Sequence, residues 1–372
     1  MRVLWLTTRH APQTGGMAQS SSRLVNSLRD RAHRVAVLHL APDVPADATR
    51  AESLIRCDAA DLREPERIFW KHRDAIADSL LVGFGGTIAG YLAALWARWA
   101  GAKSLVLFRG NDFDRALHNT KAAWMTHFIL QHATIVGAVT GEMTDRIRTI
   151  RTGPVIFTPN SADASQWLPL ERDLAAARRF RMERGLDGVP VVAMFGELKA
   201  KKGVDLACRI FDQLGLAERA RLLTVGSLPE PLAALQADPA RAYWIHVPFT
   251  AHDELPAWYA ASDIVFIPSL YDGMPNVLLE AMAAGRIVAG SRAGGMPDVI
   301  IDGENGFLFD IADADDAARV INMILDMDDA SKRAIAESAR RTVCERFTAE
   351  REIAAIESAL CEFADEPAGA RS

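Results

Sequence analysis

Short apolar runs of strand length recur along the chain, and segments with helix signals lie between them. The run Ile264–Ile267 contains no polar residue, which is typical of a buried strand. Arg2–Thr7 and Ser104–Phe108 are further apolar runs. This alternation of strand and helix in both halves predicts doubly wound α/β sheets. The other expected strands cover residues 33–39, 80–83, 133–138, 155–160, 191–195, 221–226, 244–249 and 286–290, and the expected helices include 20–28, 254–262, 275–284, 330–345 and 351–363.

The most informative stretch follows Ile264–Ile267. A loop leads to Pro275, which suits the first residue of a helix because its missing N–H is not needed there. The helix should end before Gly285, a residue typical of left-handed C-terminal caps. A second strand then leads to a glycine turn at residues 293–297, which opens another helix. The stretch therefore contains strand, loop and helix twice in succession.

The chemistry of this stretch follows from its expected geometry. Free backbone N–H groups at a helix N-terminus bind anions or hydroxyls, and Gly273, Gly294 and Gly295 let a ligand approach the backbone. Asp272 lies at the mouth of that site, and Glu280 follows roughly two helical turns later. Two such carboxylates can hold separate hydroxyls of one extended, phosphate-bearing ligand. Taken alone, the pair also fits an N-terminal helix charge and a solvated helix residue.

The whole string resembles the signature of the family 4 retaining glycosyltransferases, which have the GT-B fold. The family's Glu-x7-Glu pair corresponds to Asp272 and Glu280, so a shorter carboxylate stands at the first position. Asp298 likewise stands where the family has a glutamate. The other matching positions are Pro268, Ser269, the small-residue helix 281–285, Gly294, Gly295, Met296, Pro297, Gly303 and Gly306.

The resemblance implies two doubly wound Rossmann-like domains that face a central cleft. We expect an acceptor-side domain at residues 1–170 and a nucleotide-sugar donor domain at 171–348. A helix at 349–366 should cross back onto the first domain, and residues 367–372 should be disordered. The polar, arginine-rich run 171–185 should carry the chain from one domain to the other.

The resemblance also implies residue roles at the donor site. Glu280 corresponds to the residue that holds the ribose hydroxyls and Asp272 to the one that holds the sugar. Lys202 matches the family's diphosphate-binding lysine, but Glu197 stands where the family has an arginine. Lys199 or Lys201 could replace that arginine, and we prefer Lys199; a solvated lysine loop is the alternative. The remaining donor-side residues are Gly15, Gly16, Gly196, Gly226, Val247, Phe249, Gly273, Met274, Pro275 and Asn276, of which Val247 and Phe249 should lie against the base.

The first domain offers a polar cluster at the carboxyl end of a strand, where open α/β sheets bind ligands. Arg109 stands where the family often has a histidine, and it could hold a phosphate or an acidic acceptor group. An Arg–Asp pair that stabilises the loop is the alternative. Asn111 and Asp112 are the acceptor-side candidates. Gly15 and Gly16 do not match the dinucleotide pattern Gly-x-Gly-x-x-Gly, and a plain tight turn is the alternative for them.

The implied reaction is transfer of a sugar from a nucleoside diphosphate sugar, UDP or GDP, to an acceptor hydroxyl with retained anomeric configuration. Such enzymes use a front-face mechanism, in which Asp272, Lys202 and Arg109 would be the catalytic residues. No metal or other cofactor is expected, because the chain lacks an Asp-x-Asp centre in a suitable loop, and Asp112-Phe-Asp114 is in the wrong domain. A sugar-nucleotide epimerase of the same fold and a catalytically inactive nucleotide-sugar binding protein are the rival interpretations.

Composition sets wider bounds. The 372 residues suffice for two domains, and 24% charged with 49% hydrophobic residues is ordinary for a globular protein. A net charge of −6 argues against a dedicated nucleic-acid binder. The cysteines lack metal-ligand spacing, which favours reduced thiols in a cytoplasmic protein. They are Cys57, Cys208, Cys344 and Cys361.

Membrane contact is the last question that the sequence raises. Residues 79–97 carry no charge and are long enough to span a bilayer, but four glycines divide them into strand, turn and helix. A basic face of the first domain could instead touch a membrane peripherally, although a solvated helix end explains it equally. Its arginines are Arg23, Arg29, Arg31 and Arg34. We expect the acceptor to be a glycan, a lipid carrier or a small metabolite. The sequence indicates no oligomeric state.

Overall fold

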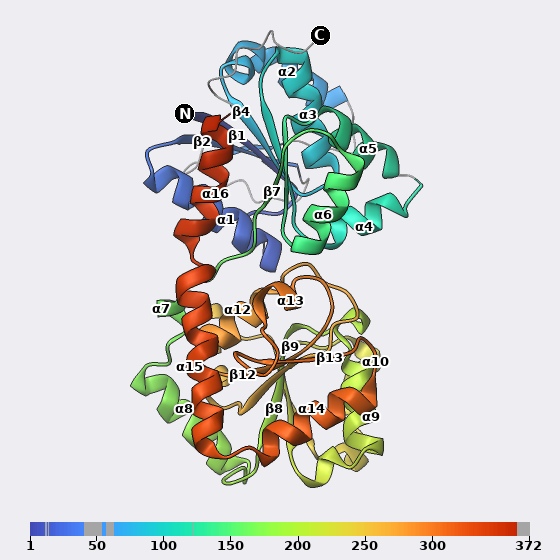
Figure 1. Cartoon of the computed structure of the whole chain (residues 1–372), viewed down its shortest axis with the longest axis vertical. Coiled ribbons are helices and arrows are strands. Elements are labelled where there is room, and N and C mark those ends of the chain that lie inside the picture. The colour runs from blue at the N-terminus through green and yellow to red at the C-terminus, as the bar shows by residue number, and fades with distance from the viewer. Residues whose placement is uncertain (12, 14, 41–53, 57–62, 121, 363–372) are drawn as a thin grey trace. The chain divides into compact units, whose positions relative to one another are not determined.

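The computed structural model of the chain describes residues 1–11, 13, 15–40, 54–56, 63–120 and 122–362 (Figure 1). Cys57 and the tail 367–372 lie outside this part. The chain forms two compact units, one of residues 1–160 together with the C-terminal segment from Ala349, the other of Ser161–Thr348. Both are α/β units with an all-parallel sheet, as the alternating pattern predicts.

The first unit has a seven-stranded sheet in the order β3-β2-β1-β4-β5-β6-β7. The order runs outward in both directions from β1 and β4, which is the doubly wound arrangement. Its strands are β1 (Arg2–Thr7), β2 (Arg34–His39), β3 (Leu54–Arg56), β4 (Leu80–Phe84), β5 (Ser104–Phe108), β6 (Ile135–Ala138) and β7 (Val155–Phe157). Its helices are α1 (Gly16–Asp30), α2 (Arg63–Ala77), α3 (Ile88–Ala100), α4 (Asn111–Leu117), α5 (Ala123–His132), α6 (Gly141–Ile150) and α16 (Ala349–Glu362).

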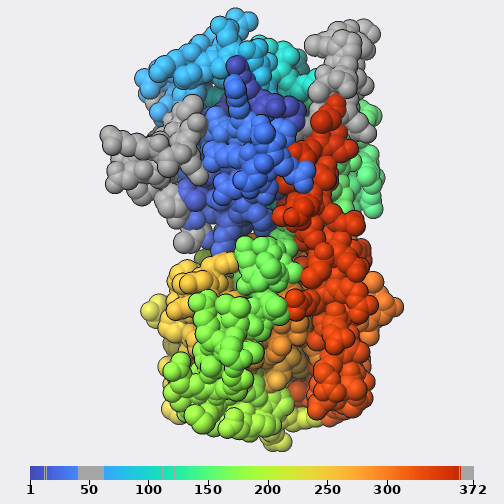
Figure 2. Space-filling model, turned by 90° about the vertical axis from the view of Figure 1, so that its left-hand side faces the viewer, coloured from blue at the N-terminus to red at the C-terminus, as the bar shows by residue number. Residues whose placement is uncertain are grey.

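Two cores cover the two faces of this sheet, because successive side chains of a strand point to opposite sides. In β1, Leu4 and Leu6 join a core with residues of α2, α3 and α5. Val3 and Trp5 join the other core, to which α1 and α16 contribute. Figure 2 shows α16, in dark red, against the blue surface of α1. Helix α16 thus completes the core of the first unit.

The second unit has a six-stranded sheet in the order β10-β9-β8-β11-β12-β13. Helices α9 and α14 pack on one face, in a core with Val192, Leu222 and Ile264. The strands are β8 (Val191–Glu197), β9 (Arg221–Ser227), β10 (Trp244–Val247), β11 (Ile264–Ile267), β12 (Ile287–Ser291) and β13 (Phe307–Phe309). The helices and short 3-10 turns are α7 (Ala164–Trp167), α8 (Glu171–Glu183), η2 (Ala200–Lys202), α9 (Val204–Gln213), η3 (Leu216–Glu218), α10 (Glu230–Gln236), η4 (Pro239–Arg241), η5 (His252–Glu254), α11 (Leu255–Ala260), α12 (Asn276–Ala283), α13 (Met296–Val299), α14 (Ala314–Asp326) and α15 (Asp329–Arg346).

The boundary between the units falls ten residues earlier than the predicted 170/171, at 160/161. The reason is α7, which contacts α12 and α15 and buries Trp167 in the second unit. The prediction that residues 171–185 connect the domains is also wrong, because these residues lie within the second unit. These residues form α8, which packs on α11 through Phe180 and Trp258, with ring centroids 4.9 Å apart.

Smaller differences concern element ends. Pro275 is the N-terminal cap of α12 and not its first residue, and α1 begins at Gly16 and not at residue 20. Such shifts of the ends are common where the terminal turn has few intrahelical bonds. Residues 80–84 and 88–100 form β4 and α3, and within the described part of the chain no helix is long and apolar enough to cross a membrane.

Candidate functional site

The candidate donor site lies at the carboxyl edge of the second sheet. Because β8, β9, β11 and β12 are parallel neighbours, the loops that follow them emerge at one edge. The loop after β8 carries Lys199 and Lys202, and the loop after β11 carries Asp272 and Gly273. Residues 202 and 272 are far apart in the sequence, so the sheet order brings them together.

The two glycine turns of this site are in direct backbone contact. The N–H of Gly295 donates to the carbonyl of Gly273 at 2.8 Å, and the Ser291 hydroxyl donates to the carbonyl of Ser269 at 2.6 Å. A Cβ on Gly294 would lie 2.0 Å from the carbonyl oxygen of Asp272, and the φ of Gly294 is +54°. Glycine is therefore required for this packing, since any side chain would push the two loops apart.

Asp272 and Lys202 form the charged centre of the site. The Lys202 Nζ lies 2.5 Å from Asp272 Oδ2, and the two side chains are 21% and 16% exposed. The other carboxylate oxygen accepts a hydrogen bond from the N–H of Gly273 at 3.0 Å. A cation and a carboxylate are thus held side by side, partly open to solvent, next to the start of α12.

Glu280 is a buried carboxylate and not a solvated helix residue, since it is 8% exposed. Its Oε2 accepts a hydrogen bond from the hydroxyl of Tyr259 at 2.8 Å. Burial and the charge of Glu280 hold the pKa of Tyr259 well above its ordinary value, so the phenol stays a donor. Tyr259 stacks on Phe195 with ring centroids 4.1 Å apart, which fixes the position of its hydroxyl. Sequence reasoning missed Tyr259, because nothing local links it to a carboxylate that follows 21 residues later.

The three lysines that follow β8 have different partners. Lys199 Nζ lies 2.8 Å from Glu197, and both side chains are exposed. Lys201 lies over the ring of Tyr271, 5.6 Å from its centroid, and burial lowers the pKa of its ammonium group. Lys202 alone of the three pairs with Asp272. The predicted substitute for the family arginine therefore binds the glutamate that occupies the arginine's position.

The remaining donor-side residues of the second unit lie in or directly after β8, β9 and β10, or at the start of α12. Gly196 and Gly226 are neighbours in the register of β8 and β9, and a Cβ on Gly226 would lie 2.0 Å from the carbonyl oxygen of Gly196. Val247 ends β10 and is partly buried, and Phe249 is 71% exposed. Met274 is buried directly before Pro275 and Asn276, the cap and first residue of α12.

The other predicted residues lie in the first unit, at the carboxyl edge of its sheet. Gly15 caps α1 with a φ of +109°, and a Cβ there would meet no atom within 4 Å. Asp112 accepts hydrogen bonds from the N–H groups of Gly86 at 2.6 Å and Arg109 at 3.1 Å. Burial raises the pKa of Asp112, and these N–H groups oppose the increase. Gly16 and Asn111 are the first residues of α1 and α4.

Arg109 occupies a different environment from the one we predicted. Its guanidinium is 2% exposed and donates to the carbonyl of Thr158 at 3.0 Å and to the side chain of Asn160. Its Nη2 also pairs with Glu352 of α16 at 2.8 Å. The alternative prediction was a structural ion pair between Arg109 and an aspartate of the loop. Arg109 does form a structural ion pair, but its partner is Glu352. The buried cation is thus compensated within the first unit.

The basic face of the first unit is also engaged by α16. Arg23 pairs with Glu352 at 2.8 Å and Arg31 with Glu357 at 2.7 Å. Arg29 donates to the carbonyl of Val35 at 3.1 Å. These arginines therefore stabilise the first unit, which no local sequence pattern indicated. In the part of the chain that the structure describes, Cys208, Cys344 and Cys361 are free.

Comparison with known proteins gives a family match for part of the second unit and a fold match for the chain. Residues 189–327, most of the second unit, match the family described as glycosyl transferases group 1. The chain is similar to Anabaena HepE, solved in complex with UDP, with a TM-score of 0.81 and 18% identity over 98% of this chain and 100% of that one. The chain therefore has the GT-B fold.

Two relatives illustrate the degree of sequence similarity. A D-inositol 3-phosphate glycosyltransferase of Acidothermus cellulolyticus is 33% identical over 50% of this chain and 42% of its own. A GDP-mannose-dependent alpha-(1-6)-phosphatidylinositol monomannoside mannosyltransferase of Mycobacterium tuberculosis is 28% identical over 88% of this chain and 90% of its own. The chain spans only 32 to 47% of the length of four of the curated relatives that it matches.

Proposed function

We propose that this chain is a retaining glycosyltransferase that moves a sugar from a nucleoside diphosphate sugar to an acceptor hydroxyl. The observation that carries the proposal is the arrangement of Lys202, Asp272 and Glu280 around the glycine turns of a domain that matches the group 1 family. A nucleotide sugar needs a cation for its diphosphate and carboxylates for its hydroxyl groups. The UDP in the HepE structure and the GDP-mannose in the name of the mycobacterial relative support UDP or GDP as the nucleotide.

Each residue has a defined role in the proposal. Glu280 accepts the ribose hydroxyls, and Asp272 accepts the sugar hydroxyls together with backbone groups of residues 273–276. Lys202 neutralises the diphosphate and is assisted by Lys199 once that side chain leaves Glu197. Arg109 has a positioning role, because its guanidinium already binds Asn160 and Glu352.

The reaction proceeds on one face of the sugar. The bond between the anomeric carbon and the diphosphate oxygen breaks while the acceptor oxygen bonds to the same carbon from the same side. A phosphate oxygen of the leaving group takes the acceptor proton, so this step requires no general base from the enzyme. Lys202 stabilises the negative charge that develops on the diphosphate, which lowers the barrier. Asn111 and Asp112 lie on the acceptor side, toward a glycan, a lipid carrier or a small metabolite.

The first test is a thermal shift with a panel of UDP-, GDP-, ADP- and TDP-sugars. A ligand at 100 times its Kd stabilises the folded state by about 2.7 kcal/mol, so one donor should raise the melting temperature clearly. Glu280→Ala should abolish the rise, and Glu304→Ala, a change of an exposed glutamate, should retain it. No rise with any sugar nucleotide would contradict the proposed donor site.

A catalytically inactive sugar-nucleotide binding protein is the second candidate, favoured by the Lys199–Glu197 pair. That pair removes one of the cations on which the leaving diphosphate depends. Release of nucleoside diphosphate in the presence of an acceptor mixture separates the two candidates. Donor binding without release, in the wild type and in Asp272→Glu, would favour the binding protein. Isomerised sugar from donor alone would indicate an epimerase.

A further inference from the structure

The second unit has a pocket at the edge of its sheet opposite the candidate donor site. Pro190, Asp263 and Arg286, which directly precede β8, β11 and β12, line it together with α14 and α15. Its volume is about 350 Å³. Pockets of roughly 300 to 1,000 Å³ hold small organic ligands. Because the strands run from this pocket to the donor loops, nothing in the proposed reaction uses it.

The pocket has an apolar floor and a charged rim. Ile264, Ile287 and Ile324 form the floor. The rim contains four cations, Arg181, Arg286, Lys332 and Arg333, and two carboxylates, Asp263 and Asp329. The protein as a whole has a net charge of −6, so a local excess of two positive charges stands out against the rest of the surface.

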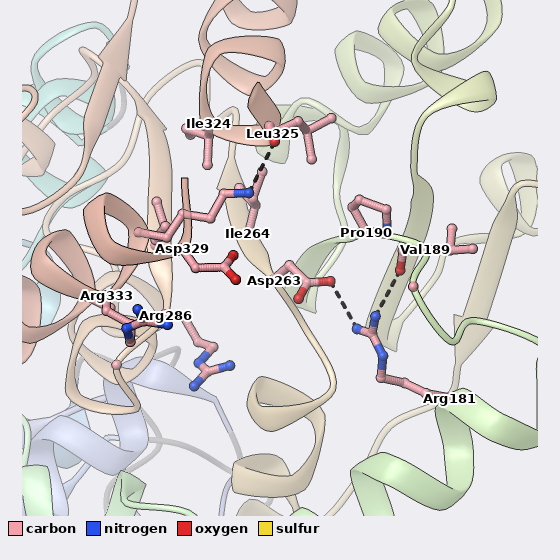
Figure 3. A pocket seen from close by; sticks show the side chains of 15 residues that line it. Arg181, Val189, Pro190, Asp263, Ile264, Arg286, Ile324, Leu325, Asp329 and Arg333 are labelled. Atoms are coloured by element: carbon pink, nitrogen blue, oxygen red, sulfur yellow. Dashed lines mark hydrogen bonds and ion pairs between the residues drawn. The ribbon is translucent and has the colours of Figure 1, made fainter. Parts of the chain in front are cut away.

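On one side of the rim, Arg181 has an acidic partner and Lys332 has a carbonyl partner. Arg181 Nη1 pairs with Asp263 at 2.9 Å, and the same carboxylate oxygen accepts from the N–H of Val191 at 2.7 Å. Lys332 Nζ donates to the carbonyl of Leu325 at 3.1 Å. The dashed lines in Figure 3 mark the contacts of Arg181 and Leu325.

The other side holds two guanidinium groups that form no ion pair within residues 161–348. Figure 3 places Arg286 and Arg333 on the same side of the pocket, with Asp329 above them. Arg286 donates to the carbonyls of Ala284 at 3.3 Å and Ser262 at 3.2 Å. Among residues 161–348, no carboxylate lies within ion-pair distance of Arg286 or Arg333. Burial lowers the pKa of the Arg286 guanidinium, and the charge of Asp263 opposes the decrease.

We propose that this pocket binds a small organic phosphate, whose phosphate group bridges Arg286 and Arg333 and whose organic part covers the isoleucine floor. Two planar guanidinium groups present paired N–H donors that match the oxygens of a phosphate. The anion supplies the charge that the rim lacks. The site is independent of the proposed glycosyltransferase reaction, because it shares no residue with the donor loops.

The test is calorimetric titration of the full chain with phenyl phosphate and with inorganic phosphate, at constant ionic strength in chloride buffer. Arg333→Gln should weaken phenyl phosphate binding about tenfold or more, since it removes charge-assisted hydrogen bonds. Arg341→Gln is the matched control, because it makes the same change on an exposed face of α15 away from the pocket. Asp329→Asn should tighten phenyl phosphate binding, since it removes a negative charge that repels the phosphate. A variant that is merely destabilised would not bind more tightly.

The outcomes separate this pocket from the donor loops. Binding that survives Lys202→Ala and is lost in Arg333→Gln supports the proposal. Binding lost in Lys202→Ala and retained in Arg333→Gln would place the anion at the donor loops and overturn it. Absence of binding by the wild type, or equal losses in Arg333→Gln and Arg341→Gln, would also overturn it. Inorganic phosphate that binds as tightly as phenyl phosphate would refute the organic ligand.

Discussion

Glu280 depends on residues that contribute nothing else to the donor site. A buried carboxylate is costly unless hydrogen bonds compensate its lost hydration. The Tyr259 hydroxyl supplies such a bond, and two aromatic rings, Phe195 and Trp167, hold the Tyr259 ring in place. The position of the predicted ribose ligand is therefore set by side chains from α7, β8 and α11.

Removing the Tyr259 hydroxyl should expose this dependence. Tyr259→Phe keeps the ring contacts but leaves Glu280 Oε2 without that donor, which should lower the free energy of unfolding by about 1 to 3 kcal/mol. Urea unfolding measures the loss, and the thermal response to the donor should weaken in parallel. Tyr271→Phe changes a tyrosine that is 55% exposed and should alter stability by less than about 0.5 kcal/mol. Equal stability of Tyr259→Phe and wild type would show that the hydrogen bond does not support Glu280.

At the scale of elements, the η2 turn and the loop after β11 are fixed to one another by backbone contacts. The N–H of Leu270 donates to the carbonyl of Lys201 at 2.9 Å. Gly203 ends η2 with a φ of +73°, and a Cβ there would lie 2.0 Å from the carbonyl oxygen of Pro268. Lys202 reaches Asp272 because these two segments touch.

A comparison of Gly203 with Gly215 separates the energetic cost of left-handed backbone strain from the cost of a close contact. Both have a φ of +73°, but a Cβ on Gly215 would meet nothing within 4 Å. Gly215→Ala should therefore cost only the left-handed strain, about 1 to 2 kcal/mol. Gly203→Ala should cost about 1 to 3 kcal/mol more, because the backbone must move away from Pro268. Comparison of the two urea midpoints tests this, and identical losses would mean that the contact between the loops is unimportant.

At the scale of the whole molecule, the first unit is built from two distant parts of the sequence. Ile353, Ile356 and Ala359 of α16 enter the core formed by β1 and α1. Glu352 joins the same helix to Arg109 and Arg23. Along the sequence, all residues of the second unit, 161–348, precede the C-terminal segment that completes the first unit.

Truncation of a buried side chain of α16 should leave a cavity in the core of the first unit and therefore destabilise that unit selectively. Ile356 is fully buried, so Ile356→Ala should cost about 2 to 5 kcal/mol. Amide hydrogen exchange should accelerate in β1, β2 and α1 and stay unchanged in β8 and α9. Ile311→Ala, at a position 47% exposed, is the control and should leave both units protected. Faster exchange throughout both units would contradict the division into separate cores.

Much of the architecture was predictable because it is local. The apolar runs gave β1, β5 and β11 with the observed ends, since a strand buried in a parallel sheet requires continuous apolar residues. The glycine turns and the spacing of Asp272 and Glu280 likewise indicated one carboxylate in the loop before a helix and a second carboxylate within that helix. Prediction failed where local composition was uninformative, as in the polar α8, which packs on α11 through the rings of Phe180 and Trp258.

The sequence by itself determined the order of strands and helices, the glycine turns and the residue types at the two candidate sites. Only the tertiary structure decided which charges meet. Lys202 binds Asp272, Lys199 binds Glu197, and Arg109 binds Glu352 instead of facing a ligand. The physical reason is that an ion pair depends on distance in space, and sheet order and the return of α16 bring together residues separated by up to 329 positions.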